Sequence, residues 1–230
     1  MDVLYVAFLL TFLFTLVVQF KVSSTFKKYS RVFAGAGKNG AEVARRILDA
    51  HGLFNVRIER VHGHLTDHYD PTARVLRLSG SVYDNASPSA VGVAAHEVGH
   101  AIQHAEGYAP IKWRTKLVPA VSFASRFSWI AIMLGILIMY TSTILGSYVL
   151  LAGIILFSAT TLFHLVTLPC EFNASRRALA ELELTGWYSD GELGMSKAVL
   201  RAAAMTYVAA LAMSFIQLLR FLKIFANRRD

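Results

Sequence analysis

The 230-residue chain is more apolar than an ordinary water-soluble protein. Hydrophobic residues make up 55% of it and charged residues only 17%, which argues against a single soluble domain. The formal net charge is +8, but the basic residues lie mostly beside apolar runs, as expected for contact with an anionic membrane surface rather than with nucleic acid. The single cysteine, Cys170, excludes an intramolecular disulfide and a disulfide-stapled secreted domain.

The first apolar run predicts a transmembrane anchor over residues 1–20. Its length suffices to cross a hydrocarbon core of about 30 Å at about 1.5 Å per residue. A cleaved signal peptide is the alternative, but such peptides carry basic residues before the apolar run and small residues after it. Asp2 and Lys21 stand at these places, so we expect an uncleaved anchor.

Three further apolar segments follow. Residues 128–168 are predicted to form a transmembrane helical hairpin, with its tight turn at Gly146 and Ser147. Residues 202–230 hold a shorter fourth membrane helix, which spans the bilayer or lies against the other helices, and a basic tail. The chain is therefore expected to be a multi-pass protein of the cell membrane.

Two regions face water, residues 21–127 and 169–201. The first carries 15 of the 23 lysine and arginine residues, which favours the cytoplasmic side for both regions. The basic tail disagrees with this orientation if the fourth segment spans. We predict that residues 21–127 form a small α+β domain and that residues 169–201 add a helix and a loop.

The α+β domain has recognisable elements. The pattern predicts a helix over 41–50, a half-buried strand from Phe54 through Ile58, a second strand over 73–79 and a long helix over 88–106. Ser87 followed by Pro88 starts this last helix, because a hydroxyl caps it and a proline suits its first position.

The helix over 88–106 contains His96, Glu97 and His100. Imidazoles four residues apart lie one turn apart on the same helix face, and they can bind one zinc ion at about 2.1 Å each. Glu97, beside the first histidine, is placed to act as a general base toward a zinc-activated water. This spacing predicts a zinc-dependent hydrolase.

A catalytic zinc site needs a third protein ligand. His104 is one candidate, but its Cα lies about 12 Å from that of His96 along a straight helix, which is too far for one ion. Glu171 is the better candidate. It follows Pro169, where we expect a new helix to begin, and the two spans of the hairpin return it to the side of the histidines. The alternative is a solvated carboxylate near a helix N-terminus.

The sequence resembles the YugP-type neutral zinc metallopeptidases of bacterial membranes, and the resemblance covers nearly the whole chain. The matching stretches are residues 61–71, 94–103, 169–179 and 206–209. The resemblance implies an integral membrane protein with one zinc ion, held by His96, His100 and Glu171, and peptidase activity with Glu97 as the base. The implied fold is an α-helical membrane protein with a small zincin-like domain of the glutamate-zincin type.

One feature departs from the glutamate-zincin pattern. Those proteins have an aspartate three or four residues after the ligand glutamate, where it orients a ligand histidine. Ala174 and Ser175 occupy these positions. A serine can hydrogen-bond an imidazole but brings no charge.

A donor for the oxyanion is also expected. His68 and Tyr69 are the candidates in the segment between the strands, with Tyr207 and Arg176 as rivals. His62 and His64 are assigned to a polar loop. The strand over 73–79 is expected either to pair with an extended substrate or only to pack.

The sequence thus predicts a zinc metalloendopeptidase of the bilayer that acts on peptide or membrane-protein substrates. The alternative is a membrane scaffold with a structural zinc site and no catalysis. The sequence identifies neither the substrate nor the oligomeric state.

Overall fold

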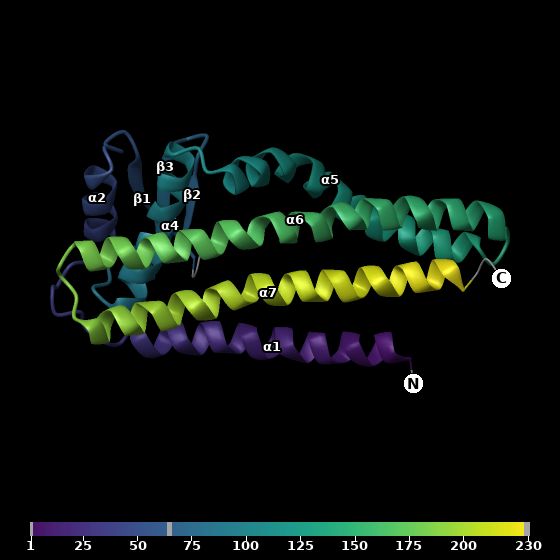
Figure 1. Ribbon diagram of the computed structural model, residues 1–230, viewed down its shortest axis with the longest axis horizontal. Helices are drawn as coiled ribbons and strands as arrows, with labels where there is room; N and C mark the ends of the chain where they lie inside the picture. Colours follow the sequence, from purple (N-terminus) through teal and green to yellow (C-terminus); the bar gives the residue numbers. More distant parts are fainter. Residues whose placement is uncertain (1, 64–65, 228–230) are drawn as a thin grey trace. The chain divides into compact units, whose positions relative to one another are not determined.

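The computed structural model describes residues 2–63 and 66–227, so His64 lies outside the described residues. These residues form seven helices and three strands (Figure 1). In chain order they are α1 (Val3–Tyr29), α2 (Gly40–Ala50), β1 (Arg57–Val61), β2 (His68–Asp70), β3 (Val75–Ser79), α3 (Gly80–Tyr83), α4 (Pro88–Ala105), α5 (Ala109–Ile138), α6 (Thr143–Leu184) and α7 (Asp190–Ala226). The described chain divides into two compact units. One comprises residues 2–17, 113–168 and 206–227, and the other residues 18–112 and 169–205.

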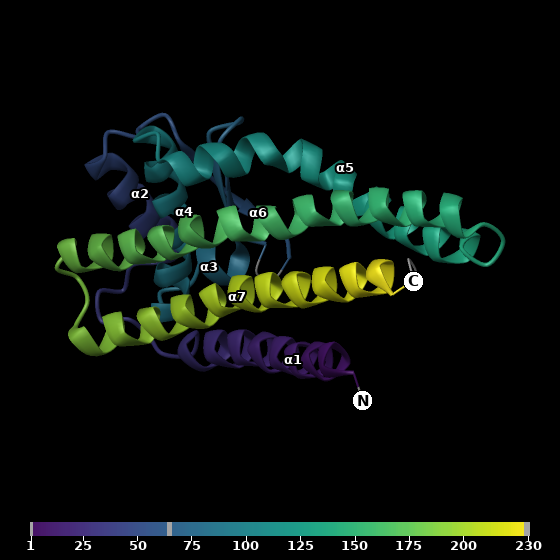
Figure 2. The same ribbon diagram turned by 45° about the vertical axis from the view of Figure 1, so that its right-hand side comes forward.

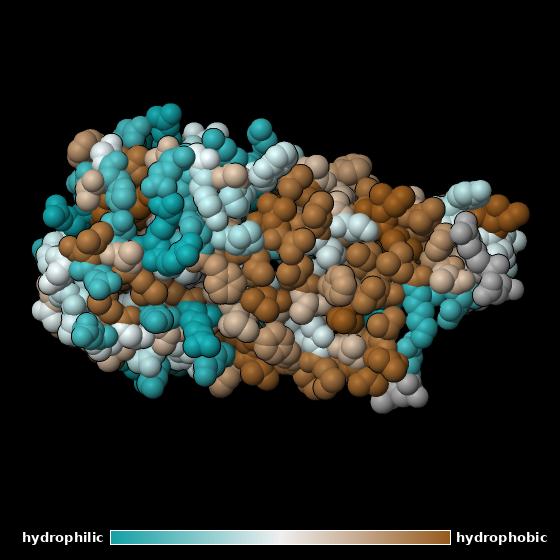
Figure 3. Space-filling view, viewed as in Figure 1, coloured by the Kyte–Doolittle hydropathy of each residue, from teal (hydrophilic) through white to brown (hydrophobic). Residues whose placement is uncertain are grey.

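The first unit is a helical membrane bundle. Helices α1, α5, α6 and α7 are each long and apolar enough to cross a membrane. Apolar side chains dominate the visible surface of this unit, whereas hydrophilic ones gather on the other unit (Figure 3). The aromatic rings of Trp129, Phe157 and Phe221 pack edge to face, with the two phenylalanines buried. The prediction of a helical membrane protein with a small α+β domain is confirmed.

The hairpin turn lies earlier in the chain than the sequence predicts. Helix α5 ends at Ile138 and α6 begins at Thr143, and a short turn joins the two helices (Figure 2). Gly146 therefore lies inside α6. A Cβ at Gly146 would lie 2.5 Å from the Met139 backbone nitrogen. The glycine therefore permits close contact with the preceding segment rather than a turn. The prediction of a turn at Gly146 and Ser147 was wrong.

The second unit contains a three-stranded sheet in the order β1-β3-β2. Strand β1 runs parallel to β3, and β2 runs antiparallel to it. The predicted strand from Phe54 starts too early, because β1 begins at Arg57. Phe54 is 72% exposed, whereas Val56 is buried in the core and Ile58 packs against it. Strand β2 was missed, since three residues are too few for a recognisable alternation.

Strand β3 lies in the middle of the sheet, between β1 and β2. Its register joins Leu76 to Ile58 of β1 on one side and to Tyr69 of β2 on the other. A strand paired on both sides has no free edge for another peptide. Of the two alternatives for the strand over 73–79, pairing with substrate is therefore excluded along 75–77, and packing in the sheet agrees with the structure. The edge strands of this sheet are β2 and β1.

Helix α4 begins where the sequence predicts. The Ser87 hydroxyl accepts a hydrogen bond from the Ala90 backbone N–H at 3.3 Å, and Pro88 occupies the first turn. The helix packs in the centre of the core of this unit. Buried core residues include Val43, Ile47, Leu76, Leu78, Val91, Val98, Ile102, Leu182 and Leu200.

Helix α6 does not restart at Pro169 but runs through it without interruption. Proline in a helix interior costs about 3 kcal/mol. On its C-terminal side, Ala174, Ala178 and Leu182 are fully buried at successive helical turns, and their burial offsets this cost. The prediction of a helix beginning at Pro169 was wrong, although the helical state of the residues that follow was predicted correctly.

Candidate metal site

Helices α4 and α6 bring three side chains that can bind a metal together in the second unit. The Nε2 atoms of His96 and His100 lie 3.2 and 3.6 Å from Glu171 Oε2. One donor atom from each residue lies within 4.8 Å of the others. Glu171 is only 1% exposed, so it is not the solvated carboxylate of the alternative interpretation. The structure thus joins the three residues that the sequence nominates.

These separations fit a zinc ion. With bonds of about 2.1 Å, two donors of a tetrahedron lie about 3.4 Å apart, close to both distances from Glu171. Two imidazoles and one carboxylate are also a donor set that zinc accepts in catalytic sites, with the fourth position open. The spacing and the donor atoms of His96, His100 and Glu171 therefore fit a zinc ion.

Helix α4 packs closely against α6 and α7. A Cβ at Gly99 would lie 2.8 Å from the Ala174 carbonyl oxygen of α6. A Cβ at Gly92 would lie 3.2 Å from the Ser196 Cβ of α7, and the buried Ser196 hydroxyl donates to the Pro88 carbonyl at 2.8 Å. Glycine at position 99, between Glu97 and His100, thus allows the Glu171 helix to approach the two histidines.

Both histidines are held through the ring nitrogen that faces away from Glu171. Ser175 Oγ lies 3.1 Å from His96 Nδ1. Gln103 Oε1 lies 3.0 Å from His100 Nδ1. In metal sites such contacts fix the orientation of the ring. The sequence suggested Ser175 for this role but missed Gln103, although its place three residues after His100 puts it on the same helix face.

Glu97 lies against the edge strand β2. Its Oε2 accepts a hydrogen bond of 3.1 Å from the Tyr69 backbone N–H. Burial raises the pKa of the Glu97 carboxyl above its ordinary value, and positive charge on His96 and His100 opposes part of this rise. A carboxylate with a raised pKa takes up a proton more readily at neutral pH, as a general base must.

The remaining candidates lie around β2. The imidazole of His68 is exposed, with Nδ1 2.8 Å from the Thr66 carbonyl oxygen and Nε2 3.5 Å from an Arg77 nitrogen. The Tyr69 ring is half-buried and packs on the ring of His104, with 5.7 Å between ring centres. Burial raises the pKa of the Tyr69 phenol, so it stays protonated at neutral pH.

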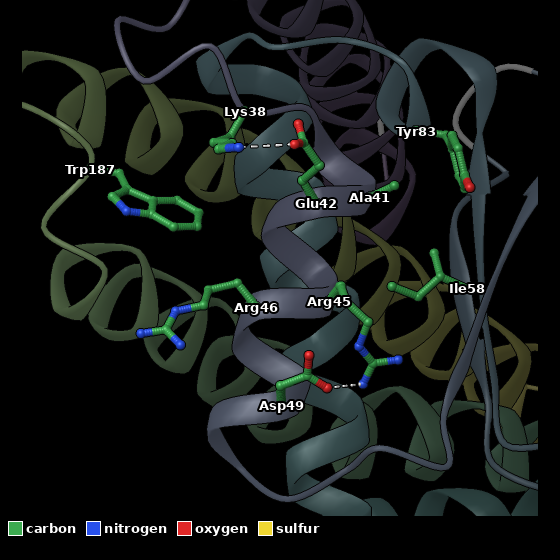
Figure 4. A pocket seen from close by; sticks show the side chains of 9 residues that line it. All are labelled: Lys38, Ala41, Glu42, Arg45, Arg46, Asp49, Ile58, Tyr83 and Trp187. Atoms are coloured by element: carbon green, nitrogen blue, oxygen red, sulfur yellow. Dashed lines mark hydrogen bonds and ion pairs between the residues drawn. The ribbon is translucent and has the colours of Figure 1, made fainter.

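A separate cavity of about 600 Å³ lies beside α2 (Figure 4). Four of its five charged side chains form pairs: Lys38 with Glu42 at 3.0 Å and Arg45 with Asp49 at 2.8 Å. It is lined by Lys38, Ala41, Glu42, Arg45, Arg46, Asp49, Ile58, Tyr83 and Trp187. None of these residues belongs to the metal-binding cluster, so the cavity is not part of this site.

Comparison with known proteins agrees with this chemistry. Residues 4–226 match the family described as "Putative neutral zinc metallopeptidase". The chain is 52% identical over 213 residues to the "Putative membrane protease YugP" of Bacillus subtilis (strain 168), and the match covers 92% of each chain. No solved structure matches the chain. With His96, His100 and Glu171 close enough for one metal ion, and with a match that spans nearly its whole length, the chain belongs to this family of zinc metallopeptidases.

Proposed function

We propose that the protein is a membrane-anchored zinc endopeptidase in which His96, His100 and Glu171 hold the metal and Glu97 is the general base. The observation that carries this proposal is the convergence of three donor atoms, with the Glu171 carboxylate 3.2 and 3.6 Å from the two imidazoles. Glu97 adjoins the first of these histidines in the chain. The family and the curated relative support peptide hydrolysis over a non-catalytic scaffold.

The chemistry divides between the metal and the protein. When bound, zinc supplies Lewis-acid polarisation of a peptide carbonyl and a water of lowered pKa. Glu97 takes the proton of the attacking water and then delivers it to the leaving amine. The Tyr69 N–H, 3.1 Å from Glu97 Oε2, orients the carboxylate for these two transfers. Ser175 and Gln103 hold the two imidazoles.

Strand β2 is the proposed place for the substrate backbone. It is an edge strand, and the contact between Tyr69 and Glu97 puts it beside the catalytic helix. Pairing of an extended peptide with such an edge gives affinity with little sequence preference. From this strand we propose His68 or Tyr69 as the donor for the oxyanion. The substrate is then an extended segment of a peptide or a membrane protein.

We further propose that the site faces the cytoplasm from the cell membrane. Residues 21–127 carry 15 of the 23 lysine and arginine residues, and basic residues flanking membrane spans favour that side. Lys27 and Lys28, in the last turn of α1, and Lys116, in α5, are examples close to apolar segments.

The test is the isosteric variant Glu97→Gln, assayed on unfolded casein and on a quenched fluorescent peptide library. We expect the variant to bind one zinc per chain and to lose hydrolysis by more than about 1,000-fold, since the water then lacks its base. Glu183→Gln, an exposed glutamate of the same unit, is the matched control and should cleave like the parent. Hydrolysis by Glu97→Gln at the parent rate would refute the proposed mechanism.

A structural zinc gives a different pattern. In a scaffold, Glu97→Gln would change nothing, and removal of zinc by a chelator would unfold the protein. For a catalytic site we expect the chelated protein to stay folded and to regain activity when zinc returns. Circular dichroism and activity, measured on the same sample, separate the two cases.

A further inference from the structure

We infer that Gln103 is a positioning residue that fixes the orientation of His100 and fastens the Glu171 helix to the histidine helix. The inference rests on the proposed function insofar as it takes His100 and Glu171 as metal ligands. Gln103 is fully buried in α4. A buried amide without partners is costly, because each unsatisfied donor or acceptor loses its hydrogen bonds to water.

The Gln103 amide uses both of its ends. Nε2 donates to the Cys170 carbonyl oxygen at 2.8 Å and to Asn173 Oδ1 at 2.9 Å. Oε1 lies 3.0 Å from His100 Nδ1 and 3.3 Å from the Cys170 thiol, which donates to it. The amide therefore contacts a proposed ligand on α4 and the residue just before Glu171 on α6.

This arrangement determines which nitrogen of His100 carries the hydrogen. The Cys170 carbonyl can only accept a hydrogen bond, so the amide atom facing it must be the NH₂ group. The other end of the amide is then an oxygen, which also only accepts. Consequently His100 Nδ1 must be the donor. A neutral His100 then presents the lone pair of Nε2, and Nε2 is the atom 3.6 Å from Glu171 Oε2.

The orientation of the outer partner, Asn173, agrees with that of the Gln103 amide. The Arg177 Nε–H, which can only donate, gives a hydrogen bond of 2.8 Å to Asn173 Oδ1. This bond identifies that Asn173 atom as the oxygen, in agreement with the orientation of Gln103. Arg177 also pairs at 2.6 Å with Glu106, the residue that follows α4. Polar contacts thus join α4 to α6 at two levels, and Gln103 is the member in contact with a proposed ligand.

The other histidine is held less strictly. Ser175 Oγ, 3.1 Å from His96 Nδ1, can donate or accept, because a hydroxyl does both. It therefore orients the His96 ring without choosing its tautomer. We expect the two contacts to differ in importance, with the Gln103 contact contributing more to metal affinity.

The experiment measures zinc affinity in the full-length protein in detergent, by competition with a chromophoric chelator. Gln103→Met keeps the volume of the side chain and removes its hydrogen bonds. We expect zinc binding to weaken by about 10- to 100-fold, the range for residues that orient metal-binding histidines. The visible absorption of the cobalt-substituted protein should also change, because a reoriented imidazole alters the ligand field. Neither measurement depends on hydrolysis.

Two further variants separate positioning from general stability. Gln103→Glu keeps an acceptor for His100 but cannot donate to α6, so it should retain more zinc affinity than Gln103→Met. Asn173→Ala removes an outer partner and leaves the His100 and Cys170 contacts in place. It should bind zinc like the parent and give the parent's cobalt spectrum. If Gln103→Met does not fold, the zinc affinities of Gln103→Glu and Asn173→Ala are compared instead. Weaker binding by Gln103→Glu than by Asn173→Ala supports the positioning role of Gln103, and equal binding by the two variants overturns it.

The inference is overturned if Gln103→Met binds zinc like the parent with an unchanged cobalt spectrum. It is equally overturned if Asn173→Ala weakens binding as much as Gln103→Met does, because the effect would then be general destabilisation. Failure of the proposed function looks different. In that case the parent protein binds no zinc, or keeps it in His96→Ala, or Glu97→Gln remains active.

Discussion

Glu171 Oε2 lies 3.2 Å from His96 Nε2, although the apolar hairpin of α5 and α6 separates the two residues in the chain. Residues 113–168, which belong to the other compact unit, lie between them in the chain. An even number of spans between the two residues is a requirement of this arrangement.

The first prediction concerns the pH dependence of zinc affinity. Burial alone would lower the pKa of His100, but its interactions with Cys170, Glu171 and the Glu97 charge outweigh burial and raise the pKa to about 10. Zinc requires the neutral imidazole. The ion must therefore displace a proton at neutral pH, and apparent affinity should rise with pH through the neutral range, by about tenfold per pH unit.

Competition titrations with a chelator of known proton affinity, between pH 6 and pH 9 at constant ionic strength, measure this slope. Proton release on binding, detected in a weakly buffered solution with a pH indicator, is an independent readout. A zinc affinity independent of pH over this range would show that the His100 imidazole carries no proton to displace.

The second prediction concerns the contact between α4 and α6. Gly99→Ala puts a methyl group 2.8 Å from the Ala174 carbonyl oxygen, so the helices must separate. We expect the free energy of unfolding to fall by about 1–3 kcal/mol and zinc binding to weaken, because Glu171 moves with α6. Gly194→Ala is the control, since no atom lies within 4 Å of a Cβ there. It should stabilise α7 by about 0.5–1 kcal/mol.

Thermal unfolding in detergent, with and without zinc, compares these two variants. The zinc-dependent rise in melting temperature should be smaller for Gly99→Ala than for the parent and unchanged for Gly194→Ala. An equal zinc-dependent rise in all three proteins would contradict the idea that this close approach positions Glu171.

The third prediction tests the phenol of Tyr69 as the oxyanion donor. Tyr69→Phe keeps the ring that packs on His104 and the backbone N–H that contacts Glu97. Loss of one such donor lowers kcat by about 10²- to 10³-fold, with zinc content and KM close to the parent values. Steady-state kinetics of Tyr69→Phe and His68→Gln distinguish the two proposed donors. Parent-like kcat values for both variants would exclude their side chains from this role.

Parts of this structure were predictable because local chemistry determines them. Ser87 and Pro88 fix the start of α4 through a cap and a first-turn proline, and four apolar segments predict the membrane helices. The prediction of a turn at Gly146 was wrong for a physical reason. Glycine is common both in turns and where helices pack closely, and only the contact with Met139 shows which of the two applies here. Helix α6 likewise continues through Pro169 because side chains after the proline are buried against other helices. Local sequence patterns do not reveal this burial.

The site was predictable to the extent that spacing on one helix determines it. His96 and His100 share a face because they are one turn apart. Gln103 shares that face, yet its role follows only from contact with Cys170 and Asn173 of another helix. Strand β2 was missed for a similar reason, since its three residues are defined by pairing with β3 and not by their own pattern.

The most direct test of the account locates the metal. A crystal structure of the zinc-loaded protein, with anomalous difference maps above and below the zinc absorption edge, gives its position. We expect one zinc about 2.0–2.2 Å from His96 Nε2, His100 Nε2 and a Glu171 oxygen. A zinc ion bound at other residues, or a Glu171 side chain turned away from the two histidines in the loaded protein, would contradict it.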